Sequence, residues 1–83
     1  MTIVDSPASP VMIGGLAQMA QDLAKVPLQL RHRGVLARPT DLTGKALLVR
    51  GLVVKVKRHD TPWNYYTITD KGYDLLRRED LHP

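Results

Sequence analysis

The chain has 83 residues and a formal net charge of +4, with no Cys, no Phe and one Trp. A chain of this length forms one domain and buries only about 60% of its unfolded surface, so its core must come from aliphatic residues and a few Tyr. The absence of Cys excludes a disulfide scaffold and favours a cytoplasmic location. The apolar runs are too short to span a membrane, and the start lacks the pattern of a signal peptide. We therefore expect a small soluble domain that does not contact membranes.

Residues 1–9 have the composition of a flexible tail, and the domain is expected over 10–83. Ser9 followed by Pro10 is typical of a helix start, because Ser caps the first turn and Pro suits its first position. Apolar residues then recur at helical spacing, which predicts a helix over 10–25 that ends before Pro27. Its expected core face consists of Ile13, Leu16, Ala17, Ala20, Leu23 and Ala24.

Two shorter helices are predicted after Pro27. The first covers 28–33 and is closed by Gly34, and residues 35–38 are expected to connect it to the next helix. Thr40 or Asp41 is a suitable cap for a third helix that runs to about residue 50, where Gly51 ends it.

The hydrophobic period changes after Gly51. Apolar Leu52, Val54 and Val56 alternate with Val53, Lys55 and Lys57, which predicts a strand with one apolar and one cationic face. A return strand is expected over 64–68, with Tyr66 and Ile68 facing inward. The residues between the strands contain no Asn-Gly pair, so the connecting loop should be longer than two residues. Thr69 then caps a short last helix, on which Tyr73 and Leu76 face the core.

The positive charge is concentrated in the middle of the chain. Residues 25–59 contain nine cations and one anion, Asp41, a net charge of +8, whereas the two ends together carry −4. Segregated charge of one sign repels itself, and binding to a polyanion relieves that repulsion. The central segment is therefore expected to bind a polyanion, with a merely solvated basic face as the alternative.

The second half of the chain resembles the winged helix-turn-helix domains of MarR/PadR-type transcriptional regulators over residues 47–76. Those families have a helix ending in a Leu-x-x-x-Gly-Leu-Val pattern, then a basic wing, then a Tyr-x-Leu-Thr-x-x-Gly start to the next helix. The corresponding residues here are Leu47, Gly51, Leu52 and Val53, followed by Tyr66, Ile68, Thr69 and Gly72. The resemblance implies an α+β fold, with three helices, a β-hairpin wing and a short C-terminal helix.

The same resemblance implies sequence-specific binding of double-stranded DNA by a small bacterial or phage transcriptional regulator. Residues 40–50 would be the recognition helix in the major groove, and the wing, residues 55–64, would contact the backbone or the minor groove. The residues expected to contact DNA are Arg31, Arg33, Arg38, Thr40, Lys45, Arg50, Lys55, Lys57, Arg58 and His59.

Winged-helix regulators usually pair on DNA, which predicts a homodimer. The expected contact surface is either the first helix or the end of the last helix. On the first helix, the residues expected at that contact are Ile13, Leu16, Met19 and Ala20.

A protein partner is the alternative to DNA. If Leu47 faces the core, Leu42 and Val49 point outward beside Lys45, and an apolar pair is unusual on a surface that reads bases. Leu42, Leu48 and Val49 would then form a patch of a winged-helix protein–protein interaction module. Trp63, in the loop of the hairpin, either inserts toward a partner or folds back over apolar surface, and we expect the latter.

Catalytic and metal sites have no support in the sequence. His32, His59 and His82 lie far apart, without the spacing of zinc ligands. No Ser follows Ser9, and no phosphate-binding Gly-x-x-x-x-Gly-Lys loop is present. We therefore expect neither an enzyme nor a bound cofactor.

Overall fold

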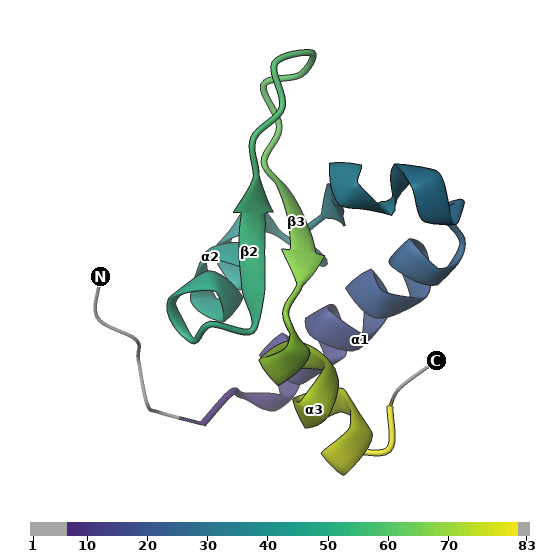
Figure 1. Ribbon diagram of the computed structural model, residues 1–83. Coiled ribbons are helices and arrows are strands. Elements are labelled where there is room, and N and C mark those ends of the chain that lie inside the picture. The colour runs from purple at the N-terminus through teal and green to yellow at the C-terminus, as the bar shows by residue number, and fades with distance from the viewer. Residues whose placement is uncertain (1–6, 82–83) are drawn as a thin grey trace.

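The computed structural model describes residues 7–81, and residues 1–6 and 82–83 lie outside the described part. The chain is α+β, with helices and a three-stranded antiparallel sheet (Figure 1). In chain order the elements are α1 (Pro10–Ala24), the 3-10 helix η1 (Leu28–Arg33), β1 (Val35–Leu36), α2 (Asp41–Val49), β2 (Val53–Val56), β3 (Tyr65–Ile68) and α3 (Asp70–Arg78). None of the helices within residues 7–81 has the length and apolar character needed to cross a membrane.

The sheet has the order β1-β3-β2, so β3 is the central strand. Val35 in β1 and Lys55 in β2 both pair with Tyr66 in β3. The strand β1 lies in a segment for which the sequence predicts only a connection. A two-residue strand is too short to show an alternating pattern in sequence, which explains the difference. Between β1 and the hairpin formed by β2 and β3, the chain forms one helix, α2.

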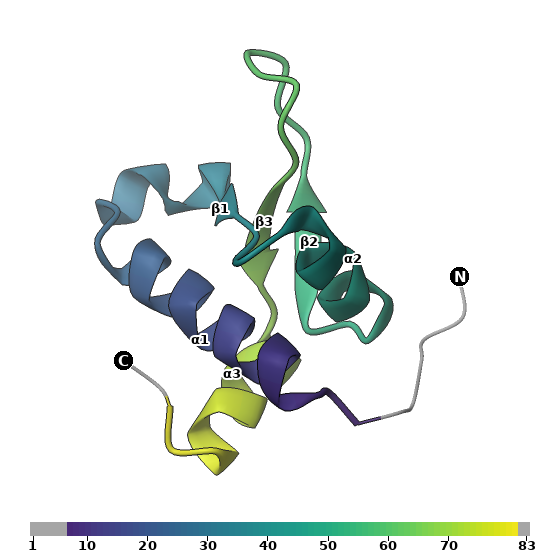
Figure 2. The same ribbon diagram turned by 180° about the vertical axis from the view of Figure 1, so that it is seen from behind.

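The helices α1 and α2 cover one face of the sheet. Figure 1 shows β2 and β3 in front of α2, and Figure 2, seen from behind, shows α1 and α2 in front of the strands. The core lies between these layers and against α3. Its largest side chains, each at most 1% exposed, are Leu16, Met19, Leu47, Val53, Tyr66 and Leu76.

The predicted faces of β2 are wrong by one residue. Val53 is fully buried, whereas Val54 is 49% exposed. Leu52 is buried too, but it precedes the strand, in the turn where its N–H donates to the carbonyl of Leu47. The alternation therefore begins at Val53, and a shift of one residue moves every side chain to the other face. The inward direction of Tyr66 is confirmed by its burial.

The predicted ends of the helices are confirmed. Ser9 accepts a hydrogen bond from the N–H of Met12 (3.3 Å), and Thr69 accepts one from the N–H of Gly72 (3.1 Å). The chain leaves η1 and α2 through Gly34 (φ 73°) and Gly51 (φ 74°), which adopt positive φ values that glycine tolerates best.

Substitution by alanine should change the stability of the domain in opposite directions at two adjacent glycines of α1. A Cβ on Gly14 would meet nothing within 4 Å, whereas one on Gly15 would collide with the carbonyl of Arg38 and the methyl group of Thr43. Gly14→Ala should raise the free energy of unfolding by about 0.5–1 kcal/mol, because alanine favours the helix. Gly15→Ala should lower it by about 1–3 kcal/mol, as overpacking does. Urea unfolding of both variants measures the difference, and equal effects would contradict the close approach of the Arg38 carbonyl.

Three of the four residues expected at a dimer contact on the first helix lie in the core instead, and the fourth, Ile13, is half-buried. Leu16 and Met19 are fully buried within the single chain and Ala20 is 2% exposed, so these side chains belong to the core of the domain. Their periodicity marks a core face, because an amphipathic helix of a small domain buries its apolar stripe within that domain.

Leu16→Asp should therefore unfold the domain rather than separate a dimer. A carboxylate buried without a partner is too costly for a domain of this size. Val11→Asp is the matched control, because Val11 is 65% exposed on the same helix and its substitution should change the stability by less than about 0.5 kcal/mol. Far-ultraviolet circular dichroism during thermal unfolding distinguishes the two, and a folded monomeric Leu16→Asp variant would contradict the prediction.

Candidate nucleic-acid interface

The helix α2 has one buried and one solvent-facing side. Leu47 and Gly44 face the core, and Gly44 lies so close to the ring of Tyr66 that a Cβ there would approach it to 2.8 Å. The opposite side presents Leu42, 75% exposed, and Lys45. Residues three or four positions apart are neighbours on one helix face, so this side forms a single stripe. The expected outward direction of Leu42 and Lys45 is confirmed.

The first turn of α2 is tied to β3 through Asp41. The hydroxyl of Tyr66 donates to Asp41 Oδ1 (2.7 Å), and the amide of Asn64 donates to Oδ2 (3.1 Å). Lys45 Nζ lies 3.5 Å from the same Oδ2. Thr40, exposed at the N-cap, makes no side-chain capping bond, so Asp41 anchors this end of the helix. One carboxylate thus ties the start of α2 to β3 and to Asn64.

These contacts change the acidity of both partners. The hydrogen bond from Tyr66 lowers the pKa of Asp41, and Asn64 and Lys45 lower it further. Burial raises the pKa of Tyr66 to about 12, and the neighbouring carboxylate of Asp41 adds to the increase. The pair is therefore a neutral donor and a charged acceptor throughout the physiological pH range.

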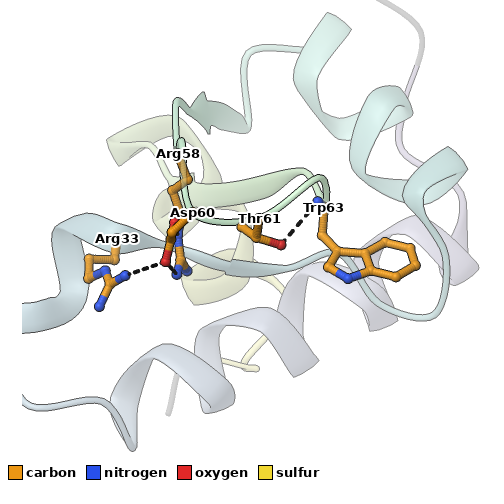
Figure 3. A network of polar contacts seen from close by, with 5 residues as sticks. All are labelled: Arg33, Arg58, Asp60, Thr61 and Trp63. Atoms are coloured by element: carbon orange, nitrogen blue, oxygen red, sulfur yellow. Dashed lines mark hydrogen bonds and ion pairs between the residues drawn. The ribbon is translucent and has the colours of Figure 1, made fainter.

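A second polar cluster joins η1 to the wing (Figure 3). Asp60 Oδ2 accepts from Arg33 Nη2 (2.9 Å) and from Arg58 Nη2 (2.8 Å), and its Oδ1 accepts from Arg58 Nε (3.1 Å). The guanidinium carbon of Arg58 lies 4.0 Å from the centre of the Tyr65 ring. Two cations from separate elements of the fold thus meet at one carboxylate.

Three of the predicted contact residues have hydrogen-bond or ion-pair partners within the chain. Arg31 donates to the carbonyls of Val26 (2.8 Å) and Ala24 (3.2 Å), where it closes the end of α1. Arg38 pairs with Asp22 of α1 (3.2 Å). Arg50 donates to the carbonyl of Ala46, one turn back in α2 (2.9 Å).

The remaining predicted cations lie on the wing and on α2. Figure 1 shows the tip of the hairpin projecting away from the helices. Lys55, Lys57 and His59 are exposed, and within residues 7–81 no carboxylate lies within ion-pair distance of any of them. Lys55, Lys57, Arg58 and His59 thus lie along the hairpin. Arg33 reaches it from η1 through Asp60, and Lys45 lies on α2.

Trp63 does not fold back over apolar surface, which corrects the expectation. Its side chain is 68% exposed, and Figure 3 shows its ring directed away from Arg33 and Arg58. It borders an open hollow of about 300 Å³ between the wing and the start of α2. The other residues lining the hollow are Leu36, Ala37, Pro39, Thr40, Asp41, Pro62 and Asn64.

The predicted apolar patch on α2 is smaller than expected. Leu48 packs against the core cluster and Val49 is half-buried, so only Leu42 of the three is largely exposed. The helical position of Leu48, next to the core residue Leu47, accounts for the difference, because a side chain 100° from the centre of the buried face still lies at its edge.

Sequence reasoning does not identify Asp60 and Asn64. It indicates only a loop between the two strands, although the separation of two residues between Asp60 and Arg58 is a usable signal. Nothing in the sequence indicates the contact of Asp60 with Arg33 or that of Asn64 with Asp41, which span 27 and 23 residues.

Among the described residues, no three His, Cys, Asp or Glu side chains gather as metal ligands would. Comparisons with protein-family models, curated proteins and solved structures find no match to this chain.

The Tyr66–Asp41 contact predicts a loss of stability at high pH. The ordinary pKa of a tyrosine is 10.0, whereas that of Tyr66 in the folded chain is about 12. Between pH 10 and 12 the unfolded chain loses the phenolic proton while the folded chain retains it, so unfolding becomes more favourable as the pH rises through this range. Below about pH 10 the contribution is complete. Urea midpoints across this alkaline range measure it, with Tyr66→Phe as control, and identical pH profiles for the two proteins would contradict it.

Proposed function

We propose that this chain is a winged-helix protein that binds double-stranded DNA through α2 and the wing. The observation that carries the proposal is the projecting hairpin with its exposed cations, which directly follows α2 and the exposed side chains of that helix. The strand order is β1-β3-β2, and a long loop joins β2 to β3 in the hairpin. This arrangement is compatible with a winged helix. In the proposed role, the chain is a small bacterial or phage transcriptional regulator that acts in the cytoplasm.

The two elements have different proposed roles. Lys45 lies on the solvent side of α2, so it would enter the major groove and contact a base edge or a phosphate beside it. Lys55, Lys57 and Arg58 would contact the phosphate backbone or the minor groove. Because η1 is a short 3-10 helix that packs beside β3, we assign the proposed reading role to α2.

The side chains at the surface limit the number of phosphate contacts. Five cations remain on the proposed surface, and they are Arg33, Lys45, Lys55, Lys57 and Arg58. Each phosphate contact contributes about −0.9 to the slope of log K against log salt concentration, and the carboxylate of Asp60 offsets about one of them. A slope of about −4 is therefore expected for a duplex.

Single substitutions test the proposed roles. Lys45→Ala should reduce affinity for a duplex selected from random sequences more than for an unselected one, by about 1–3 kcal/mol if the base contact is lost. Lys57→Ala should weaken both duplexes about equally and flatten the salt slope by about one. Arg78→Ala, an exposed cation on α3, is the control of equal charge change and should have little effect. Fluorescence anisotropy at several salt concentrations measures all three.

A protein partner is the second candidate, and the exposure of Leu42 favours it. If the wild type shows no salt-dependent duplex binding while Leu42→Asp abolishes association with a protein, α2 is a protein contact. The apolar side chain would then supply the contact energy and the cations would be a solvated surface.

A further inference from the structure

We propose that Arg33 and Arg58 form one binding site for a phosphodiester group of the nucleic-acid backbone, which Asp60 occupies as an internal substitute in the free protein. The inference rests on the proposed function and deepens it, because it assigns the ligand class to a particular pair of side chains. Figure 3 shows the carboxylate of Asp60 between the two guanidinium groups.

The geometry of the cluster suits an oxyanion with two oxygens. Arg58 binds both oxygens of Asp60, at 3.1 Å from Nε and 2.8 Å from Nη2, and Arg33 adds a third bond of 2.9 Å. Guanidinium groups bind carboxylate and phosphate through the same paired arrangement of donors. A phosphodiester with its two unesterified oxygens can therefore take the place of the carboxylate without a new arrangement of the donors.

The arginine of the wing is held in position before any ligand binds. The side chain of Arg58 is only 17% exposed and its guanidinium lies over the ring of Tyr65. Such stacking restricts the side chain, so less rotational freedom is lost when a phosphate binds. Arg33 comes from η1, so the same phosphate would connect the wing to the body of the domain.

The occupant is easy to displace. The side chain of Asp60 is 54% exposed, and ion pairs at this level of exposure contribute little to stability. The hydrogen bond from Arg58 lowers the pKa of Asp60 to about 2, so the carboxylate stays charged and competes with a phosphate at neutral pH. The exchange replaces one singly charged oxyanion by another, and Asp60 then leaves toward solvent.

Asp60→Asn tests this site, because it removes the competing charge and leaves the length of the side chain unchanged. Affinity for a random duplex should increase about three- to tenfold at about 0.1 M salt, and the salt slope should steepen by about 0.9. Asp74→Asn is the matched control, because it also releases an exposed arginine, Arg77, but on α3. It should change the affinity by less than about twofold. Weaker binding of Asp60→Asn than of the wild type would overturn the proposal, because Asp60 would then position the arginines for DNA.

A titration with inorganic phosphate tests the site without DNA. The Nε–H resonances of Arg33 and Arg58 should shift together, and at a several-fold lower phosphate concentration in Asp60→Asn than in the wild type. Adding Arg58→Ala to Asp60→Asn should remove the shift of Arg33 and the gain in duplex affinity. Resonances that move independently or not at all would overturn the proposal, even if the wild type binds DNA. Absence of duplex binding by the wild type would instead contradict the proposed function.

Discussion

The hydrogen bond between Tyr66 and Asp41 is the contact on which the arrangement of this domain depends. Tyr66 lies in the central strand with its ring buried, and its hydroxyl would be unsatisfied there without an acceptor. Asp41 supplies that acceptor from the first turn of α2. The same carboxylate accepts from Asn64 at the base of the wing. The buried ring and its acceptor therefore connect the sheet, the helix and the hairpin, the three parts of the proposed DNA-binding surface.

The positive charge of the central segment is divided between the fold and the surface. Arg38 pairs with Asp22, and Arg31 closes the end of α1 by binding its last carbonyls. These two cations therefore already have acceptors within the chain. Lys55 and Lys57 are exposed on the projecting hairpin. A net charge counted along the sequence therefore overstates the charge that an external polyanion meets, since acidic residues on either side of the segment fold back onto it.

The connection between α1 and α2 shapes the domain more than its length suggests. The strand β1 adds an edge to the hairpin, and its pairing with β3 draws η1 alongside the sheet. The short helix predicted over residues 28–33 is a 3-10 helix that packs beside β3. Its last residue, Arg33, is thereby close enough to the wing to bind Asp60.

The sequence by itself determined the local features, because they depend on residues within about four positions of one another. The caps at Ser9 and Thr69, the helix ends at Gly34 and Gly51, and the burial of Leu47 could all be predicted. Only the tertiary structure decided the phase of β2, the pairing of β1 and the exposure of Trp63. It alone also decided which cations remain at the surface. The physical reason is distance along the chain: the contacts Asp41–Tyr66 and Arg33–Asp60 span 25 and 27 residues. Their partners are chosen by packing of the whole domain, which no periodicity or spacing in the sequence encodes.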